Sequence, residues 1–212
     1  MKTLKIAVSV VLMALTASAA FAAGTTKMTN SMSSSTSGNW TFGLQGGGSM
    51  PTGDYGNVAK TGWNFGGQAD YWMNSQWGFG ADAAYHANNA SDDENAALVA
   101  DPTFGPGSEE KFSIIQYGVH ATYLIPMQGQ VAPYLQGGVA GYNIKDKITG
   151  GLAPGDVSSN KVGFNIGGGV DFHATSSVNL GVGGTYHYVS TDPTALNWFG
   201  VQGRVTFKMP TK

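Results

Sequence analysis

Histidine and serine are the residues of this chain whose types and spacing could do chemistry. His187 and Ser190 are close in sequence, and a serine hydrolase needs a serine activated by a histidine that an acid orients. The predicted strand at residues 178–189, which carries His187, contains no acid, so this pair alone predicts no active site. The remaining histidines, His86, His120 and His173, are dispersed, and none has metal-ligand spacing to another. Cysteine is absent, which excludes disulfides and thiolate chemistry. We therefore predict no catalytic residue, no metal and no cofactor.

Composition limits the elements that could position these residues. The chain has 212 residues, enough for one domain, and 32 of them are glycine. A glycine costs a helix about 1 kcal/mol, which nearly excludes a helical bundle. Charged residues make up only 11%, and 11 basic against 13 acidic residues give no basic field for nucleic acid. Disorder is disfavoured because 11% of the residues are aromatic and the net charge is small.

The N-terminal segment has the pattern of an export signal. Lys2 and Lys5 precede an apolar run at residues 6–15, and Ala20-Phe21-Ala22 fits a cleavage site of small residues. This run is too short for a membrane-spanning helix. We predict a signal peptide at residues 1–22, a flexible Ser/Thr-rich leader at 23–38 and one domain at 39–208.

From Trp40 onward, apolar and polar residues alternate with a period of two, which indicates β-strands with one apolar face. The predicted strands are residues 39–47, 63–71, 77–86, 113–125, 131–143, 162–173, 178–189 and 198–208. Short turns at 73–76, 126–130 and 174–177 alternate with longer polar connections at 49–62, 87–110, 145–160 and 190–196. This alternation predicts an up-and-down meander. The connection at 87–110 is long enough to hide a hairpin, so ten strands are the alternative to eight.

The apolar faces carry aromatic residues at the strand ends and small aliphatic residues between them. A soluble barrel would carry a dense charged coat on its outside, which the polar faces here lack. Two aromatic girdles around an aliphatic belt instead suit the two interfaces of a membrane. The girdle at the short turns is Trp40, Tyr71, Trp77, Tyr123, Phe172 and Phe207; the other is Trp63, Tyr85, Phe164, Tyr186, Tyr188 and Phe199. Since hydrocarbon offers no partner to backbone groups, we predict an all-β, closed, antiparallel transmembrane barrel.

With these features the chain resembles the small eight-stranded bacterial outer-membrane β-barrel family, the OmpX-like and OmpA-barrel-like group. The resemblance covers nearly all of residues 40–207 and includes the final strand, which ends Arg204-Val205-Thr206-Phe207. Members typically end on an aromatic residue that the outer-membrane assembly machinery recognises, whereas this chain continues through residues 208–212. The resemblance implies a location in the bacterial outer membrane. The implied partners are outer-membrane lipid, lipopolysaccharide and the assembly machinery, and we expect a monomer.

The inward face contains the single arginine of the chain, Arg204. An isolated charge in a partly dry lumen is expensive, so we predict that Arg204 pairs with one of three inward carboxylates, Asp70, Asp82 or Asp171. Such a pair would act as a plug across the lumen. The other inward polar residues singled out are His120, Gln116 and Gln202.

A run of acids, residues 92–94, 101, 109 and 110, occupies the connection at 87–110 without an intervening base. It lacks the glycine-punctuated pattern of a calcium loop, so we interpret it as a solvated loop.

The function that these features predict is a non-enzymatic barrel that contributes to the envelope and presents four loops outside. The alternative is a narrow channel for ions or small solutes, because inward glycines could leave water-filled gaps in an interior that eight strands nearly fill. A lipid A-modifying enzyme on the same scaffold and a soluble secreted β-sandwich are further alternatives.

Overall fold

The computed structural model describes residues 38–191 and 194–209. The predicted signal peptide, and the predicted leader except for Gly38, lie outside the described residues. Among the residues described, no helix has the length and apolar character needed to cross a membrane.

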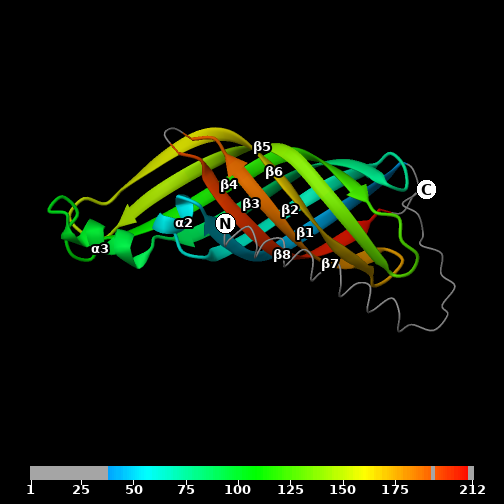
Figure 1. Ribbon diagram of the computed structural model, residues 1–212, viewed down its shortest axis with the longest axis horizontal. Coiled ribbons are helices and arrows are strands. Elements are labelled where there is room, and N and C mark those ends of the chain that lie inside the picture. The colour runs from blue at the N-terminus through cyan, green and yellow to red at the C-terminus, as the bar shows by residue number, and fades with distance from the viewer. Residues whose placement is uncertain (1–37, 192–193, 210–212) are drawn as a thin grey trace.

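Eight antiparallel strands close into a barrel in sequence order (Figure 1). The strands are β1 (Asn39–Thr52), β2 (Gly62–Trp72), β3 (Trp77–Asn89), β4 (Glu109–Leu124), β5 (Val131–Thr149), β6 (Gly155–His173), β7 (Val178–Val189) and β8 (Leu196–Lys208). The first strand pairs with the last, with Leu44 opposite Val205 and Gln45 opposite Arg204. The prediction of a closed eight-stranded barrel is confirmed, and the ten-strand alternative is wrong.

The connections divide the barrel into a short-turn end and a long-loop end. At the long-loop end the strands run beyond their predicted limits, and the connection expected at 145–160 is mostly strand. There β4 (residues 109–112), β5 (143–149) and β6 (155–162) form an extension that we call the projecting sheet. Gly150 and Gly151 turn its tip with φ of 74° and 62°, a conformation that glycine adopts without strain.

Two short helices lie at the long-loop end. Helix α2 (Tyr55–Val58) packs on β1 and β8, and α3 (Asp92–Ala100) packs on β4. The oxygen of the Ser91 side chain accepts a hydrogen bond from the backbone N–H of Glu94, which caps α3. The connection at 87–110 therefore holds a helix and not a hidden hairpin.

Candidate functional site

The two faces of the barrel wall differ sharply in chemistry. Leu44, Val119 and Ile166 point outward and are 54–61% exposed. Polar side chains such as Asn64 and Gln116 point inward and are buried. This arrangement, apolar outside and polar inside, suits a wall surrounded by hydrocarbon.

Aromatic pairs on neighbouring strands mark both rims of the outer surface. At the short-turn rim, the ring centroids of Trp40 and Tyr71 are 5.3 Å apart and those of Trp77 and Tyr123 are 4.8 Å apart. At the long-loop rim, Trp63 and Tyr85 are separated by 5.5 Å, and Phe164 and Tyr188 by 5.0 Å. These distances are typical of favourable aromatic contacts, which stiffen the wall at the height of the membrane interfaces.

One girdle residue is not exposed as the sequence predicted. Phe199 lies on the outward side of β8 but is only 9% exposed. Its ring covers Gly184 on β7, where no side chain competes for the space. Phe172 and Tyr186 are half-buried, whereas Phe207 is 46% exposed.

Arg204 is buried in the lumen and forms a bidentate ion pair with Asp171. Its Nε donates to Asp171 Oδ1 at 2.7 Å, and Nη2 donates to Oδ2 of the same carboxylate. The guanidinium also lies 3.7 Å from the centre of the Tyr134 ring, a cation–π contact. Of the three carboxylates predicted as partners, Asp171 is the one that Arg204 contacts.

Asp70 and Asp82, the other two candidates, bind His120 instead. His120 Nε2 lies 2.7 Å from Asp70 Oδ1, and its Nδ1 lies 2.8 Å from Asp82 Oδ1. Both ring nitrogens must donate to carboxylates, which requires the imidazolium form. Gln116 Nε2 donates to Asp82 Oδ2 at 2.5 Å, and Gln68 Nε2 donates to Asp70 Oδ2 at 2.8 Å. The interior therefore holds two separate ionic groups rather than one network around Arg204.

The two ionic groups share one geometry, in which an acid and a base reach across a central glycine. Gly181 stands between Asp171 and Arg204 in the register of β6, β7 and β8. In the same way, Gly80 stands between Asp70 and His120 in β2, β3 and β4. A Cβ on Gly80 would lie 2.7 Å from His120 Nε2, and one on Gly181 would collide with Asp171 Oδ1. Both glycines are thus required by a close side-chain approach.

Nearer the long-loop end, the lumen is filled by an aromatic and apolar layer. The rings of Trp198 and His187 stack there with centroids 4.6 Å apart, and His86 packs edge-on against both, with its centroid 5.2 Å from that of His187. Tyr142 Oη contacts His187 Nδ1 at 3.3 Å. His86 and His187 are 101 positions apart in the sequence, and their spacing gives no sign of this contact.

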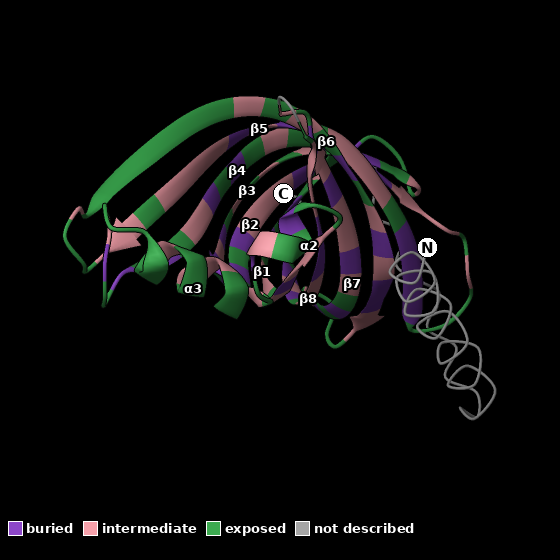
Figure 2. Ribbon diagram, turned by 60° about the vertical axis from the view of Figure 1, so that its left-hand side comes forward, coloured by how far each residue is buried: buried purple, intermediate pink, exposed green. Residues whose placement is uncertain are grey.

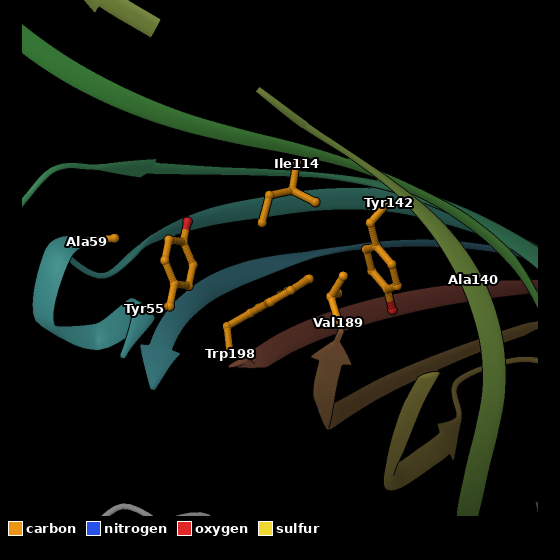
Figure 3. Close-up of a cluster of buried hydrophobic side chains, with 7 residues drawn as sticks. All are labelled: Tyr55, Ala59, Ile114, Ala140, Tyr142, Val189 and Trp198. Atoms are coloured by element: carbon orange, nitrogen blue, oxygen red, sulfur yellow. The ribbon is translucent and has the colours of Figure 1, made fainter. Parts of the chain in front are cut away.

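Further apolar residues close over this layer. A buried cluster, which we call the cap, brings together side chains from α2 and four strands (Figure 3); its members are Tyr55, Ala59, Ile114, Ala140, Tyr142, Val189 and Trp198. Trp198 and Tyr142 are fully buried. The cap therefore occludes the lumen from the long-loop side.

The space that side chains leave in the lumen is concentrated at the short-turn end. A cavity of about 440 Å³ opens there, lined by Gln68, Trp72, Asn179, Arg204 and Lys208 among others. Above it, a void of about 20 Å³ has room for about one water molecule. Its lining includes Gln202, whose Nε2 donates to Thr185 Oγ1 at 3.1 Å.

The family model of the outer membrane protein beta-barrel domain matches residues 7–208. The chain belongs to this family. It is accordingly an integral β-barrel of the bacterial outer membrane, surrounded by membrane lipid. In barrels of this kind the short turns face the periplasm and the long loops face outside. The 440 Å³ cavity thus opens to the periplasm, and the cap and the projecting sheet are extracellular.

Solved structures show the same fold at low sequence identity. Neisserial surface protein A (NspA) is 20% identical, with 82% of this chain and 98% of that one covered at a TM-score of 0.58. Ail, the attachment invasion locus protein of Yersinia pestis, in complex with the heparin analogue sucrose octasulfate, is 15% identical, with coverages of 82% and 99% and a TM-score of 0.55. A major outer membrane protein from Thermus thermophilus is 11% identical, with coverages of 81% and 98% and a TM-score of 0.55. No curated protein is significantly similar to this chain in sequence.

The barrel does not assemble the hydrolytic pair considered from the sequence. His187 is buried against Trp198 and contacts Tyr142, whereas Ser190 is exposed. His173, at the periplasmic end, contacts Asn179 Oδ1 at 2.9 Å. Within residues 38–191 and 194–209, no group of three or more metal-ligating side chains is placed to hold an ion.

The acidic connection is less solvated than the sequence predicted. Asp92 and Asp93 are exposed, but Glu110 is only 9% exposed and points inward from β4. The interpretation as a solvated loop is therefore wrong for Glu110, because the extension of β4 carries this residue into the barrel wall.

Proposed function

We propose that this barrel is a non-enzymatic surface protein that keeps its lumen shut and presents the projecting sheet to protein partners outside the cell. The observation that carries this proposal is an unpaired strand edge. Strand β6 pairs with β5 from Gly155 onward, but its pairing with β7 begins only at Gly163. In the described part of the chain, residues 155–162 thus have a partner strand on one side alone.

The exposure of this edge supports a binding role. All residues from 155 to 160, at the start of β6, are exposed (Figure 2). Val157 and Val162 are each 73% exposed. An edge strand offers a row of free N–H and C=O groups that another strand can pair with. A partner of this kind is an extended segment of another protein, which would add a strand to the sheet.

The packing of the lumen supports a surface role over a transport role. The Arg204–Asp171 and His120–Asp70 pairs border the periplasmic cavity, and the cap lies between this cavity and the outside. A channel remains the second candidate, and the periplasmic cavity of about 440 Å³ is the observation in its favour. We also propose that the assembly machinery inserts the barrel and that it acts as a monomer, since closure leaves no unpaired edge within the membrane.

A strand-forming peptide tests the edge directly. The probe is a fluorescent octapeptide of alternating threonine and valine, and the control is the same peptide with proline at alternate positions, which cannot donate to a ladder. We expect the first peptide to bind the barrel in detergent micelles, measured by fluorescence anisotropy, and the control not to bind.

Two barrel variants locate the binding. At neighbouring positions of an edge strand, one N–H faces the partner strand and the next faces solvent. Of Ser158→Pro and Ser159→Pro, the one that removes the solvent-facing N–H should fold normally and lose peptide binding. Binding that survives in this folded variant, or equal binding of both peptides, would refute the proposal.

A further inference from the structure

Three side-chain oxygens meet where the projecting sheet joins the barrel, and the hydrogen bonds of the described residues leave all three without a partner. They are Tyr55 Oη, Glu110 Oε2 and Asp146 Oδ1, from α2, β4 and β5. Tyr55 is 4% exposed and Glu110 is 9% exposed. Unpaired buried oxygens cost stability, so this grouping needs a physical reason.

Register and packing bring the three groups together. Asp146 is opposite Phe112 in the pairing of β4 and β5, and Glu110 lies two residues from Phe112 on the same face. The Tyr55 ring packs edge-on against Phe112, with centroids 5.9 Å apart. Glu110 and Asp146 are within hydrogen-bonding reach of each other, and the charge of Asp146 acts on the Tyr55 phenol.

The surrounding charges do not neutralise this pair. The ion pairs of the described residues include neither Glu110 nor Asp146. Glu94 of α3 adds a further negative charge. Three nearby lysines have other partners: Lys60 contacts Asp92, and the outward-facing Lys111 and Lys145 contact Glu109 and Asp156. Lys147 follows Asp146 in β5 and is opposite Lys111, so it lies on the outward face, away from the carboxyl pair.

Two adjacent carboxyl groups without a cation cannot both ionise cheaply, so one retains its proton. Burial, followed by the hydrogen bond and charge of Asp146 and by the charge of Glu94, raises the pKa of Glu110 to about 7. A protonated Glu110 can donate to Asp146, and the Tyr55 hydroxyl can donate to the same carboxylate. All three orphaned oxygens would then have partners.

We propose that Glu110 and Asp146 share a proton and act as a clasp, which fastens α2 and α3 to the projecting sheet and releases them as the outside medium becomes alkaline. The clasp sits beside the contacts that join the two helical loops. Ser91 N donates to Val58 O at 2.7 Å, Ala90 N donates to Glu110 O at 3.1 Å, and Glu110 N donates to Asn95 Oδ1 at 3.0 Å. The inference does not depend on what binds the free edge of β6.

The sign of the pH effect follows from linkage. The closed form binds a proton more tightly than the open form, in which Glu110 has its ordinary pKa of 4.5. The closed form is therefore fully favoured below about pH 4.5 and loses this advantage as the pH rises to about 7. Solvent near the extracellular mouth screens part of this electrostatic effect. We therefore expect the population of the open form to increase roughly ten- to a hundredfold as the pH rises through this range.

Hydrogen–deuterium exchange of the full barrel in lipid nanodiscs measures this opening. The readout is protection of residues 55–59, 90–95 and 109–112 between pD 5 and 8.5, corrected for intrinsic exchange rates. In the wild type, protection should fall across this range. Glu110→Gln carries a permanent amide donor and should stay protected throughout, whereas Glu109→Gln, an outward neighbour on the same strand, should behave as the wild type.

Two results would overturn the clasp. One is wild-type protection that does not change with pH, or the same pH dependence in Glu110→Gln as in the wild type. The other is recovery of protection at pD 8.5 on adding 10 mM calcium chloride, which would make the carboxyl pair a cation site instead.

Discussion

Two buried ion pairs of this barrel, Arg204–Asp171 and His120–Asp70, each join residues two strands apart across a glycine on the strand between them. Alternation alone was enough to predict that Arg204 points inward and to name three candidate acids. It could not choose Asp171, because the choice depends on strand stagger, which sets the relative heights of residues on different strands. The alternation predicts only that His120 is a polar residue of the lumen, so it does not show that Asp70 and Asp82 pair with His120 rather than with Arg204. The rows Asp171–Gly181–Arg204 and Asp70–Gly80–His120 become visible only once the register is known.

Removing one partner of the Arg204–Asp171 pair should be costly. Arg204→Ala leaves a buried carboxylate without its cation and should lower the stability to urea unfolding by about 3–5 kcal/mol. Removing both charges, in Arg204→Met with Asp171→Leu, should cost less than the single change. The sequence also suggested that Arg204→Ala opens the lumen, but the cap lies above this pair, so we expect no gain in conductance. Equal stability of Arg204→Ala and the wild type to urea would contradict the expected cost of leaving Asp171 without its cation.

The central glycine of each ionic row should tolerate no side chain. Gly181→Ala places a methyl group against Asp171 and Arg204, and overpacking of this kind costs about 1–3 kcal/mol. Gly137→Ala is the matched control, because the nearest atom to its added Cβ is 3.7 Å away. Thermal melting of the two variants in the same detergent checks the difference. Similar melting temperatures would show that the rows can rearrange without cost.

Among the structural elements, the strand segments within the membrane were predicted accurately from the sequence, whereas their extensions beyond the membrane were not. All eight strands exist because one face meets lipid and the other the lumen, which imposes a strict alternation. Residues 155–160 of β6 are exposed on both faces of the projecting sheet, so the alternation fades there and β5 and β6 continue beyond their predicted ends. Helix α3 was missed because none of its residues is buried, so it has no apolar periodicity. Its start was nonetheless signalled by Ser91 as a cap and by acids in the first turn.

The orientation of the strands predicts where a charge is tolerated. Val119 points to lipid at mid-height and is 58% exposed, so Val119→Lys should cost about 2–4 kcal/mol and impair stable insertion. Ala96→Lys, on the exposed side of α3, should insert as the wild type does. Heat-modifiable gel mobility of membrane fractions distinguishes folded from unfolded barrel. Normal insertion of Val119→Lys would mean that the lipid-facing side has been misassigned.

At the scale of the whole molecule, the barrel is a column of layers. A periplasmic cavity leads to two ionic groups, then to a stacked aromatic layer and the cap, and the projecting sheet stands outside. Each layer is built from side chains of several strands, so its composition follows from register and could not be assembled from the sequence. What the sequence could predict is the class of protein, because the pattern of an export signal, the alternation and the aromatic girdles can each be read locally.

The cap closes the lumen on the extracellular side, and we propose that the protein therefore works at its outer surface. Single-channel recording in planar bilayers distinguishes a closed lumen from a channel. Purified wild type is compared with a variant carrying Trp198→Ala and Tyr142→Ala, which removes the two largest fully buried side chains of the cap. We expect no steady conductance steps from the wild type and measurable steps from the variant. Large, steady steps from the wild type would contradict a closed lumen and establish the channel instead.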